Sequence, residues 1–358
     1  MRPWEIANYN YPHHAIPLGD GWWRGPEPAQ SGIFASLGDL GINSGSLLAD
    51  GSRSYFPGPE LVFDEDYCTT DQAHWIAARI HIARHECKRP LAAPRLMSIL
   101  NLTADSFSDG GRIDTPEMLL ATAKIERDAG ASIFDLGAES TRPGAAPIAA
   151  ADQIELLVPA IELLRPLGLQ ISIDTRCAAV ASACIKAGAH MINDVSALSD
   201  PAMASVVAES GCPIVLMHMR GTPATMQQHC NYQHLLGEIS DELALRVDYA
   251  LEQGIQPEQI ILDPGIGFAK TADQCLELIG KFSSLRALGF PLLCGPSRKS
   301  FLNVPLGERK PHLREHGTAA AAALSAAHGA EFLRLHQGAG NWDAVLTAHS
   351  AAVAGIEA

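Results

Sequence analysis

Residues 95–100 read RLMSIL, a short apolar run that is followed by a polar cluster and then by a stretch with helical spacing of apolar residues. The same alternation returns along the rest of the chain. The later apolar runs are SIFDL (132–136), QISID (170–174), HMIN (190–193), PIVLMH (213–218), EQIILD (258–263), PLLCG (291–295) and EFLRLH (331–336). Short apolar runs that alternate with helical stretches are typical of βα units. Eight such units predict an α/β fold closed into a TIM (β/α)8 barrel.

The stretches between these runs predict the helices of the barrel. Examples are residues 151–165, 177–188, 235–253, 272–288 and 317–328. A doubly wound parallel sheet would use the same alternation. However, no G-x-G-x-x-G follows the first strand, so a dinucleotide-binding fold lacks its strongest sequence support.

Residues 1–90 differ in kind and predict an N-terminal extension of unknown role, whereas residues 91–358 form the barrel domain. The extension holds four of the five tryptophans and many Gly and Pro residues, with one helix expected near residues 70–87. We expect so aromatic a segment to pack on the barrel or across a subunit boundary.

Composition narrows the classes of function. The chain has 358 residues, is 47% hydrophobic and carries 26 Lys and Arg against 40 Asp and Glu, a net charge of −14. So acidic a protein does not suit the phosphate backbone of nucleic acids, and any anionic substrate must meet a local cationic cluster. The first thirty residues hold no apolar run, and eight cysteines include no C-x-x-C pair. We therefore expect a cytoplasmic protein that is not bound to a membrane.

Polar side chains follow the predicted strands, where a parallel barrel places its active face. They are Asn101, Asp135, Glu139, Thr141, Arg142, Asp174, Asn193, Asp194, His218, Asp263, Ser297, Arg298, Lys299, Arg334 and His336. Helix capping alone does not explain so complete a ring, and convergent groups of this kind indicate a binding site.

The ring divides into two chemical sets. One set offers both acceptors and donors, which suits a flat, nitrogen-rich heterocycle, and consists of Asp174, Asn193, Asp263 and Lys299. The other set offers donors to phosphate oxygens and consists of Arg142, Arg334 and His336. Asn101 supplies a neutral oxygen that suits Mg2+, an ion that keeps several waters and is completed by substrate phosphates.

The sequences of these loops resemble those of the dihydropteroate synthase family. The matching segments are ILNLTADSFSDGGR (99–112), AESTRPGA (138–145), SIDT (172–175), AGAHMINDVSAL (187–198), LMHMRGTPATMQ (216–227), LDPGIGFAKT (262–271) and GPSRKSFL (295–302). They stand in the order of the family and span roughly residues 95–336, which leaves the first 90 residues unexplained.

The resemblance implies a role for each matching residue. Asn101 would help to hold Mg2+; Asp174, Asn193, Asp263 and Lys299 would bind the pterin; Arg142, Arg334 and His336 would bind pyrophosphate; Phe107, Thr141, Pro143, Phe268 and Ser300 would surround p-aminobenzoate. Lys299, Asp105 and Arg142 would be the catalytic residues. Two mobile loops, residues 101–111 and 140–145, would close over the mouth, and the barrels would pair as homodimers.

The implied reaction joins 6-hydroxymethyl-7,8-dihydropterin pyrophosphate to p-aminobenzoate in folate biosynthesis. Pyrophosphate leaves the pterin methylene, and the arylamine nitrogen attacks the stabilised cation. Cationic donors would stabilise the leaving group, and carboxylates would favour the positively charged pterin. Closure of the loops would keep water from the cation.

Three positions depart from the family pattern. Ala104 stands where a proline is usual, Ala269 replaces a glycine after Phe268, and Gln337 follows His336 in place of an aspartate. Together with the unusual N-terminus, Gln337 and Ala104 leave open a non-catalytic pterin-binding paralogue. A pterin-dependent methyl transferase of the same superfamily also stays open, because it would share the Asp and Asn contacts to the pterin. The latter would have no need of the SRKS segment or of a pyrophosphate site.

Overall fold

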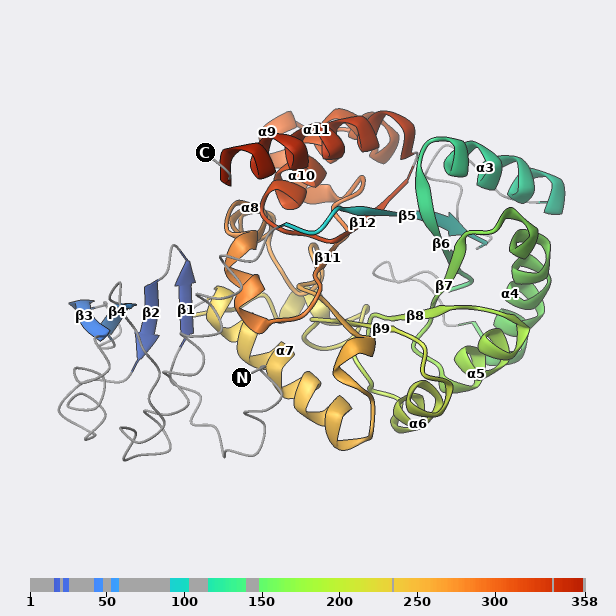
Figure 1. Cartoon of the computed structure of the whole chain (residues 1–358), viewed down its shortest axis with the longest axis horizontal. Helices are drawn as coiled ribbons and strands as arrows, with labels where there is room; N and C mark the ends of the chain where they lie inside the picture. Colours follow the sequence, from blue (N-terminus) through green and yellow to red (C-terminus); the bar gives the residue numbers. More distant parts are fainter. Residues whose placement is uncertain are drawn as a thin grey trace.

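The computed structural model describes residues 91–102, 115–139, 148–233, 235–336 and 338–356, together with the backbone of four short strands between residues 16 and 57. These strands form an antiparallel sheet in the order β1-β2-β4-β3, and their bounds are Ile16–Gly19, Trp22–Gly25, Ile42–Leu47 and Arg53–Pro57 for β1 to β4. Strand β1 lies beside helix α7 of the barrel (Figure 1). The helix predicted near residues 70–87 lies outside the described residues.

Eight parallel strands form the predicted barrel, with the helices around its outside (Figure 1). Their bounds are Arg95–Asn101 (β5), Ala131–Gly137 (β6), Gln170–Asp174 (β7), Met191–Asp194 (β8), Ile214–Met217 (β9), Ile260–Asp263 (β10), Leu293–Cys294 (β11) and Phe332–Leu335 (β12). The sheet runs in the order β10-β9-β8-β7-β6-β5-β12-β11. A parallel bridge between Leu262 and Leu292 brings its two ends together.

The helices that surround the barrel have the following bounds: Pro116–Asp128 (α3), Ala150–Leu164 (α4), Ala178–Ala187 (α5), Pro201–Ser210 (α6), Leu235–Glu252 (α7), Ala272–Gly280 (α8), Asn303–Leu306 (α9), Glu315–Ala327 (α10) and Gly338–Ile356 (α11). The stretch predicted as one helix over 272–288 divides at Lys281 into α8 and a 3-10 segment, Phe282–Leu288. Local caps begin several helices; Thr115, for example, accepts from the backbone N–H of Met118.

The inside of the barrel is built in layers, because alternate residues of a strand point to the same side. Seven strands each contribute one side chain to an apolar inner layer: Met97, Ile133, Met191, Val215, Ile261, Leu293 and Phe332. Two residues further along four of these strands stand Asp135, Asn193, Asp263 and Arg334. These four polar side chains form the next layer towards the C-terminal ends of the strands. We call this layer the polar floor of the mouth, and it lies directly on the apolar layer.

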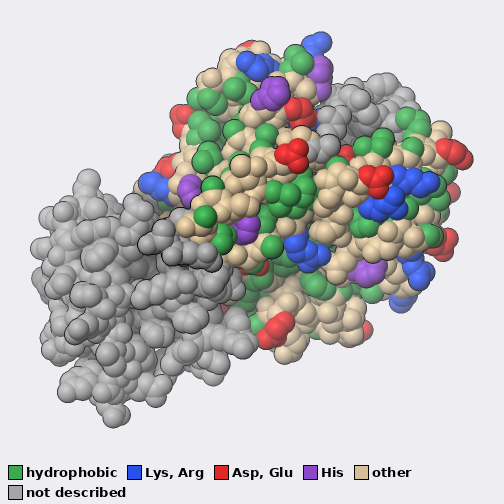
Figure 2. Space-filling model, turned by 45° about the horizontal axis from the view of Figure 1, so that its top comes forward, with side chains coloured by type: hydrophobic (Ala, Val, Ile, Leu, Met, Phe, Trp, Pro, Cys, Tyr) green, Lys and Arg blue, Asp and Glu red, His purple; other side chains and the backbone are tan. Residues whose placement is uncertain are grey.

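Among the residues that the structure describes, no helix has the length and apolar character that a membrane span requires. On the face shown in Figure 2, charged side chains of both signs are interspersed over the described surface. This face therefore shows charges of both signs rather than a patch of one sign.

Candidate functional site

One guanidinium joins two carboxylates on the polar floor of the barrel. Arg334 of β12 donates from Nε to Asp135 Oδ2 and from Nη2 to Asp174 Oδ2, both at 2.6 Å. The Asp135 side chain is fully buried, whereas that of Arg334 is 20% exposed. Two carboxylates face one cation, so the cluster keeps a negative excess that a bound ligand can use.

The effect of burial on the pKa of Asp174 is larger than the opposing effect of the Arg334 guanidinium. Burial raises the pKa of Asp174 to about 7, although the Arg334 guanidinium lowers it, and the neighbouring carboxylate of Asp135 raises it further. Like charges that share a site favour a bound proton on one of them. Near neutral pH the Asp174 carboxyl therefore exchanges between a hydrogen-bond donor and an acceptor.

Two further members of the predicted heterocycle set lie on the same floor. Asn193 is buried and donates from Nδ2 to Asp135 Oδ2 at 3.3 Å. Asp263 is also buried, and its Oδ1 accepts the backbone N–H of Gly265 at 2.7 Å. Burial raises the pKa of Asp263, and the Lys299 ammonium acts in the opposite direction.

Lys299 brings the fourth member of this set from the segment after β11. Its Nζ donates to the carbonyl oxygen of Ile266 and lies 4.5 Å from the centroid of the Phe268 ring. Burial lowers the pKa of Lys299, while the Asp263 carboxylate raises it. The contact between an ammonium and an aromatic face is favourable, so Lys299 and Phe268 hold each other in place.

The loop between β10 and α8 can reach this position only because of its backbone geometry. Gly265 has φ +69°, and a Cβ there would lie 2.1 Å from the carbonyl oxygen of His218. Ala269 has φ +49°, a left-handed conformation that favours glycine. The alanine that departs from the family pattern therefore stands where a side chain strains the backbone.

His336 directly follows β12 and lies next to the segment after β11. Its Nδ1 lies 3.1 Å from Ser297 Oγ, and its backbone N–H donates to the same oxygen at 3.1 Å. Asn341 of α11 donates from Nδ2 to the His336 carbonyl oxygen at 3.2 Å. Ser297 therefore contacts the imidazole, while the backbone of His336 is held from two sides.

Asn101 at the end of β5 fits the part expected of a magnesium ligand. A Cβ placed on Gly137 would lie 3.4 Å from Asn101 Oδ1 and 3.5 Å from Asp174 Cβ, so both side chains border the same small space. The described residues contain no cluster of three His, Cys, Asp or Glu side chains that would hold a metal by themselves. A Mg2+ ion bound through the single amide oxygen of Asn101 would have to take its other ligands from water and phosphate.

A second buried network lies beneath the Phe268 loop. Lys270 Nζ is 2.9 Å from His218 Nδ1 and donates to the Phe268 carbonyl oxygen at 2.9 Å. His218 Nε2 is 2.9 Å from Glu242 Oε2, and Arg220 donates from Nε to Glu242 Oε1 at 2.8 Å. Sequence reasoning included Asp135 in the ring of polar residues without a specific role, and it did not single out Lys270, which lies beyond the loop that follows the predicted strand 258–263.

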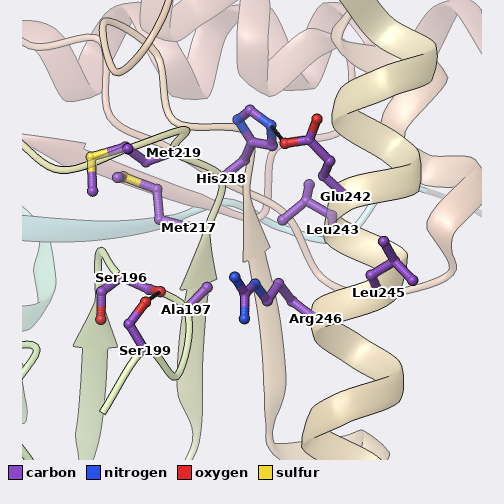
Figure 3. Close-up of a pocket in the computed structure, with 11 residues that line it drawn as sticks. Ser196, Ala197, Ser199, Met217, His218, Met219, Glu242, Leu243, Leu245 and Arg246 are labelled. Carbon is purple, nitrogen blue, oxygen red and sulfur yellow. Dashed lines mark hydrogen bonds and ion pairs between the residues drawn. The ribbon is translucent and has the colours of Figure 1, made fainter. Parts of the chain in front are cut away.

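The outer end of this network borders a cavity of about 290 Å3. Figure 3 shows His218 and Glu242 joined across it, with Arg246 further along α7. The loop after β8 closes the opposite side with Ser196 and Ser199.

Several predicted site residues cannot be placed. Asp105, Phe107, Thr141, Arg142 and Pro143 lie outside the described residues, as do Ala104 and Gln337. Ser300 begins the 3-10 segment after Lys299 and is exposed at the rim. The described chain brings together Asp174, Asn193, Asp263, Lys299 and Arg334; Phe268 adjoins them through Lys299.

Comparisons with known proteins agree with this geometry. A family model described as pterin binding enzyme matches residues 97–336. The dihydropteroate synthase of Synechocystis is 46% identical over 243 residues, which are 67% of this chain and 84% of the relative.

Solved structures give the same result for the fold. The Yersinia pestis dihydropteroate synthase in a sulfonamide complex has a TM-score of 0.69 and 36% identity, covering 74% of this chain and 95% of that one. The Xanthomonas albilineans dihydropteroate synthase with 4-aminobenzoic acid has a TM-score of 0.67 and 38% identity, covering 72% of this chain and 93% of that one.

Proposed function

This chain belongs to the dihydropteroate synthase family, and we propose that the polar floor of its barrel performs the family's reaction with the residues described above. The chain is a transferase. The substrates are 6-hydroxymethyl-7,8-dihydropterin pyrophosphate and p-aminobenzoate, and the products are 7,8-dihydropteroate and pyrophosphate. The observation that carries the assignment is the convergence of Asp135, Asp174, Asn193, Asp263, Lys299 and Arg334 on one layer of the mouth.

The pterin ring would lie on this floor. The carboxylates of Asp174 and Asp263 accept hydrogen bonds from ring N–H and amino groups, Asn193 can both accept and donate, and the Lys299 ammonium donates to a ring oxygen or nitrogen. The negative excess of the Asp135, Asp174 and Arg334 cluster stabilises positive charge on the ring as the leaving group departs.

The reaction breaks the bond between the pterin methylene carbon and a pyrophosphate oxygen. The electron pair leaves with pyrophosphate, the arylamine nitrogen of p-aminobenzoate bonds to the methylene carbon, and that nitrogen loses a proton. His336, with Arg142 and Arg334 as the cationic partners, would donate to the pyrophosphate oxygens. Phe268 would provide the aromatic wall for p-aminobenzoate, together with Thr141, Pro143, Phe107 and Ser300.

Asn101 would hold Mg2+ together with the substrate's phosphates, and the ion would supply charge stabilisation for the leaving group. The catalytic set would be Lys299, Asp105 and Arg142. Residues 91–358 would carry the activity. The protein would form a homodimer with twice the mass of the 38.1 kDa chain, which light scattering can test. It would act in a reducing cytoplasm. The six described cysteines are all free, which agrees with such a compartment.

The experiment that tests these assignments is pyrophosphate release with both substrates, with and without Mg2+, in wild type, Lys299→Met and Asn101→Ala. Lys299→Met should lose at least tenfold in kcat/KM, since it removes a charged donor. Asn101→Ala should raise the Mg2+ concentration needed for half-maximal rate. Wild-type rates in Lys299→Met, with p-aminobenzoate-dependent release intact, would overturn the assignment of Lys299.

A further inference from the structure

The loop over residues 264–269 is anchored at successive backbone atoms by side chains. Lys299 donates to the Ile266 carbonyl oxygen, Lys270 to that of Phe268, and Tyr232 Oη to that of Ala269 at 3.0 Å. Cys275 Sγ accepts the backbone N–H of Gly267 at 3.2 Å. Lys299 belongs to the proposed pterin site, whereas Lys270 contacts His218 directly after β9 and Tyr232 lies in the segment between β9 and α7.

The contacts fix the direction of the hydrogen bonds that join Lys270, His218 and Glu242. The Glu242 carboxylate at His218 Nε2 can only accept, so Nδ1 is the unprotonated nitrogen of the neutral ring and accepts from Lys270 Nζ, which also donates to the Phe268 carbonyl oxygen. The hydrogen of the neutral ring is therefore on Nε2, which donates to Glu242 at 2.9 Å. Burial, followed by the charge of Lys270, lowers the pKa of His218 to about 4, in agreement with a neutral ring.

Glu242, the last member of this series of hydrogen bonds, is held as a carboxylate. Although burial raises the pKa of Glu242, hydrogen bonds from His218 and Arg220 lower it to about 2. Arg220 in turn donates to Glu238 at 2.7 Å, and its guanidinium lies 4.0 Å from the centroid of the Tyr232 ring. Hydrogen bonds therefore connect Glu242 on the cavity wall at α7 to the backbone of Phe268 without a break.

We propose that this relay, Glu242 to His218 to Lys270, positions the Phe268 loop and so sets the affinity of the p-aminobenzoate subsite. The inference rests on the proposed function, since it takes Phe268 as the wall of that subsite. Lys270, His218 and Glu242 are positioning residues: the described hydrogen bonds of their side chains run to one another, to the Phe268 carbonyl oxygen and to Arg220, and none of the three belongs to the proposed substrate-binding set.

Helix α7 offers a test at a distance from the substrates, because Glu242 and Arg246 both line the cavity but only Glu242 reaches His218 (Figure 3). Glu242→Leu removes the acceptor for the imidazole N–H and also that for the Arg220 guanidinium. Glu242→Gln keeps an acceptor oxygen and serves as the conservative rescue. Arg246→Leu is the matched control on the same helix face.

The measurements are KM for p-aminobenzoate, KM for the pterin pyrophosphate and kcat for each variant, with pterin affinity determined separately by calorimetry. Glu242→Leu should raise KM for p-aminobenzoate by about threefold to tenfold, the loss expected for one net hydrogen bond. KM for the pterin substrate should stay within about twofold. Glu242→Gln should lie close to wild type, and Arg246→Leu should match it.

Lys270→Met and Tyr232→Phe provide an independent arm, should Glu242→Leu fail to fold. Each removes one anchor of the loop, and each should raise KM for p-aminobenzoate selectively. Unchanged KM for p-aminobenzoate in folded Lys270→Met and Tyr232→Phe, or an equal rise for both substrates, overturns the proposal. Failure of the proposed function would look different, since wild-type protein would then release no pyrophosphate in response to p-aminobenzoate.

Discussion

At the scale of single residues, two carboxylates on the polar floor of the barrel share one guanidinium. Asp135 and Asp174 both approach the Arg334 guanidinium at 2.6 Å, and one cation cannot neutralise two carboxylates. Asp135 Oδ1 is buried and has no hydrogen-bond partner among the residues that the structure describes. A pterin that brings ring N–H groups to this floor would satisfy acceptors that the protein leaves unused, and desolvated polar groups gain most from such pairing.

The pKa of Asp174 predicts how pterin binding varies with pH. Burial raises this pKa to about 7, so the ionised fraction rises from about one tenth at pH 6 to about nine tenths at pH 8. If the carboxylate accepts from the pterin, affinity for a pterin without the pyrophosphate should tighten by up to about tenfold over this range. Calorimetric titration at several pH values measures it.

The matched variant for this measurement is Asp174→Asn, which keeps the shape of the side chain and cannot titrate. Its pterin affinity should be weaker and nearly independent of pH between 6 and 8. An equally steep dependence in both proteins would assign the effect to the ligand or to another group.

At the scale of elements, substitutions of two glycines can distinguish the cost of backbone strain from the cost of steric overlap. Gly265 and Gly254 both have positive φ, +69° and +88°, but only at Gly265 would a Cβ meet a neighbour, the His218 carbonyl oxygen at 2.1 Å. Gly254→Ala should therefore cost about 1 kcal/mol of unfolding free energy, the price of a left-handed alanine.

Gly265→Ala should cost about 2 kcal/mol more than Gly254→Ala, because backbone must move against backbone. It should also weaken pterin binding, since Asp263 receives the N–H of residue 265. Urea unfolding and pterin titration of both variants measure these effects. Similar losses in the two variants would mean that the close approach of the loop to β9 has no consequence.

Elements were easier to predict from the sequence than contacts. Apolar runs and their spacing placed all eight strands to within about two residues, because period and burial are local properties. The polar floor was also predictable, since strand ends of a parallel barrel meet at one mouth. The pairing of Arg334 with Asp135 was not, because 199 positions separate them and only closure of β12 onto β5 brings them together.

The relay beneath the loop shows the same limit. Lys270 and His218 lie 52 positions apart, and a lysine in a loop is ordinarily read as solvated. Its burial depends on the Gly265 turn, which brings the loop against the end of β9. The FAKT segment therefore gave the identity of the residue but not its surroundings.

At the scale of the whole molecule, the buried Lys270 makes stability depend on pH. Burial lowers its pKa from 10.5 to about 7, so in this window the unfolded chain binds more protons than the folded one. Stability therefore rises as pH increases from about 7 towards 10.5, and it is lowest where both states are protonated. Between pH 7 and 9 the contribution amounts to about 2 kcal/mol.

Lys270→Met isolates this contribution, since methionine does not titrate. The difference in unfolding free energy between wild type and Lys270→Met should shift in favour of wild type by about 2 kcal/mol from pH 7 to pH 9. Urea unfolding at fixed ionic strength measures both proteins, with Lys281→Met, an exposed position, as control. A constant difference across the range would mean that Lys270 keeps its proton, or lacks it, in both states.

The most direct test of the central claim is whether the chain converts 6-hydroxymethyl-7,8-dihydropterin pyrophosphate and p-aminobenzoate into equal amounts of 7,8-dihydropteroate and pyrophosphate. Product can be quantified by mass spectrometry and pyrophosphate by a coupled assay in the same reaction. The site described here predicts a one-to-one yield that requires p-aminobenzoate and collapses in Lys299→Met. Tight pterin binding by the folded wild type without either product would contradict it and point to a pterin-binding protein without synthase activity.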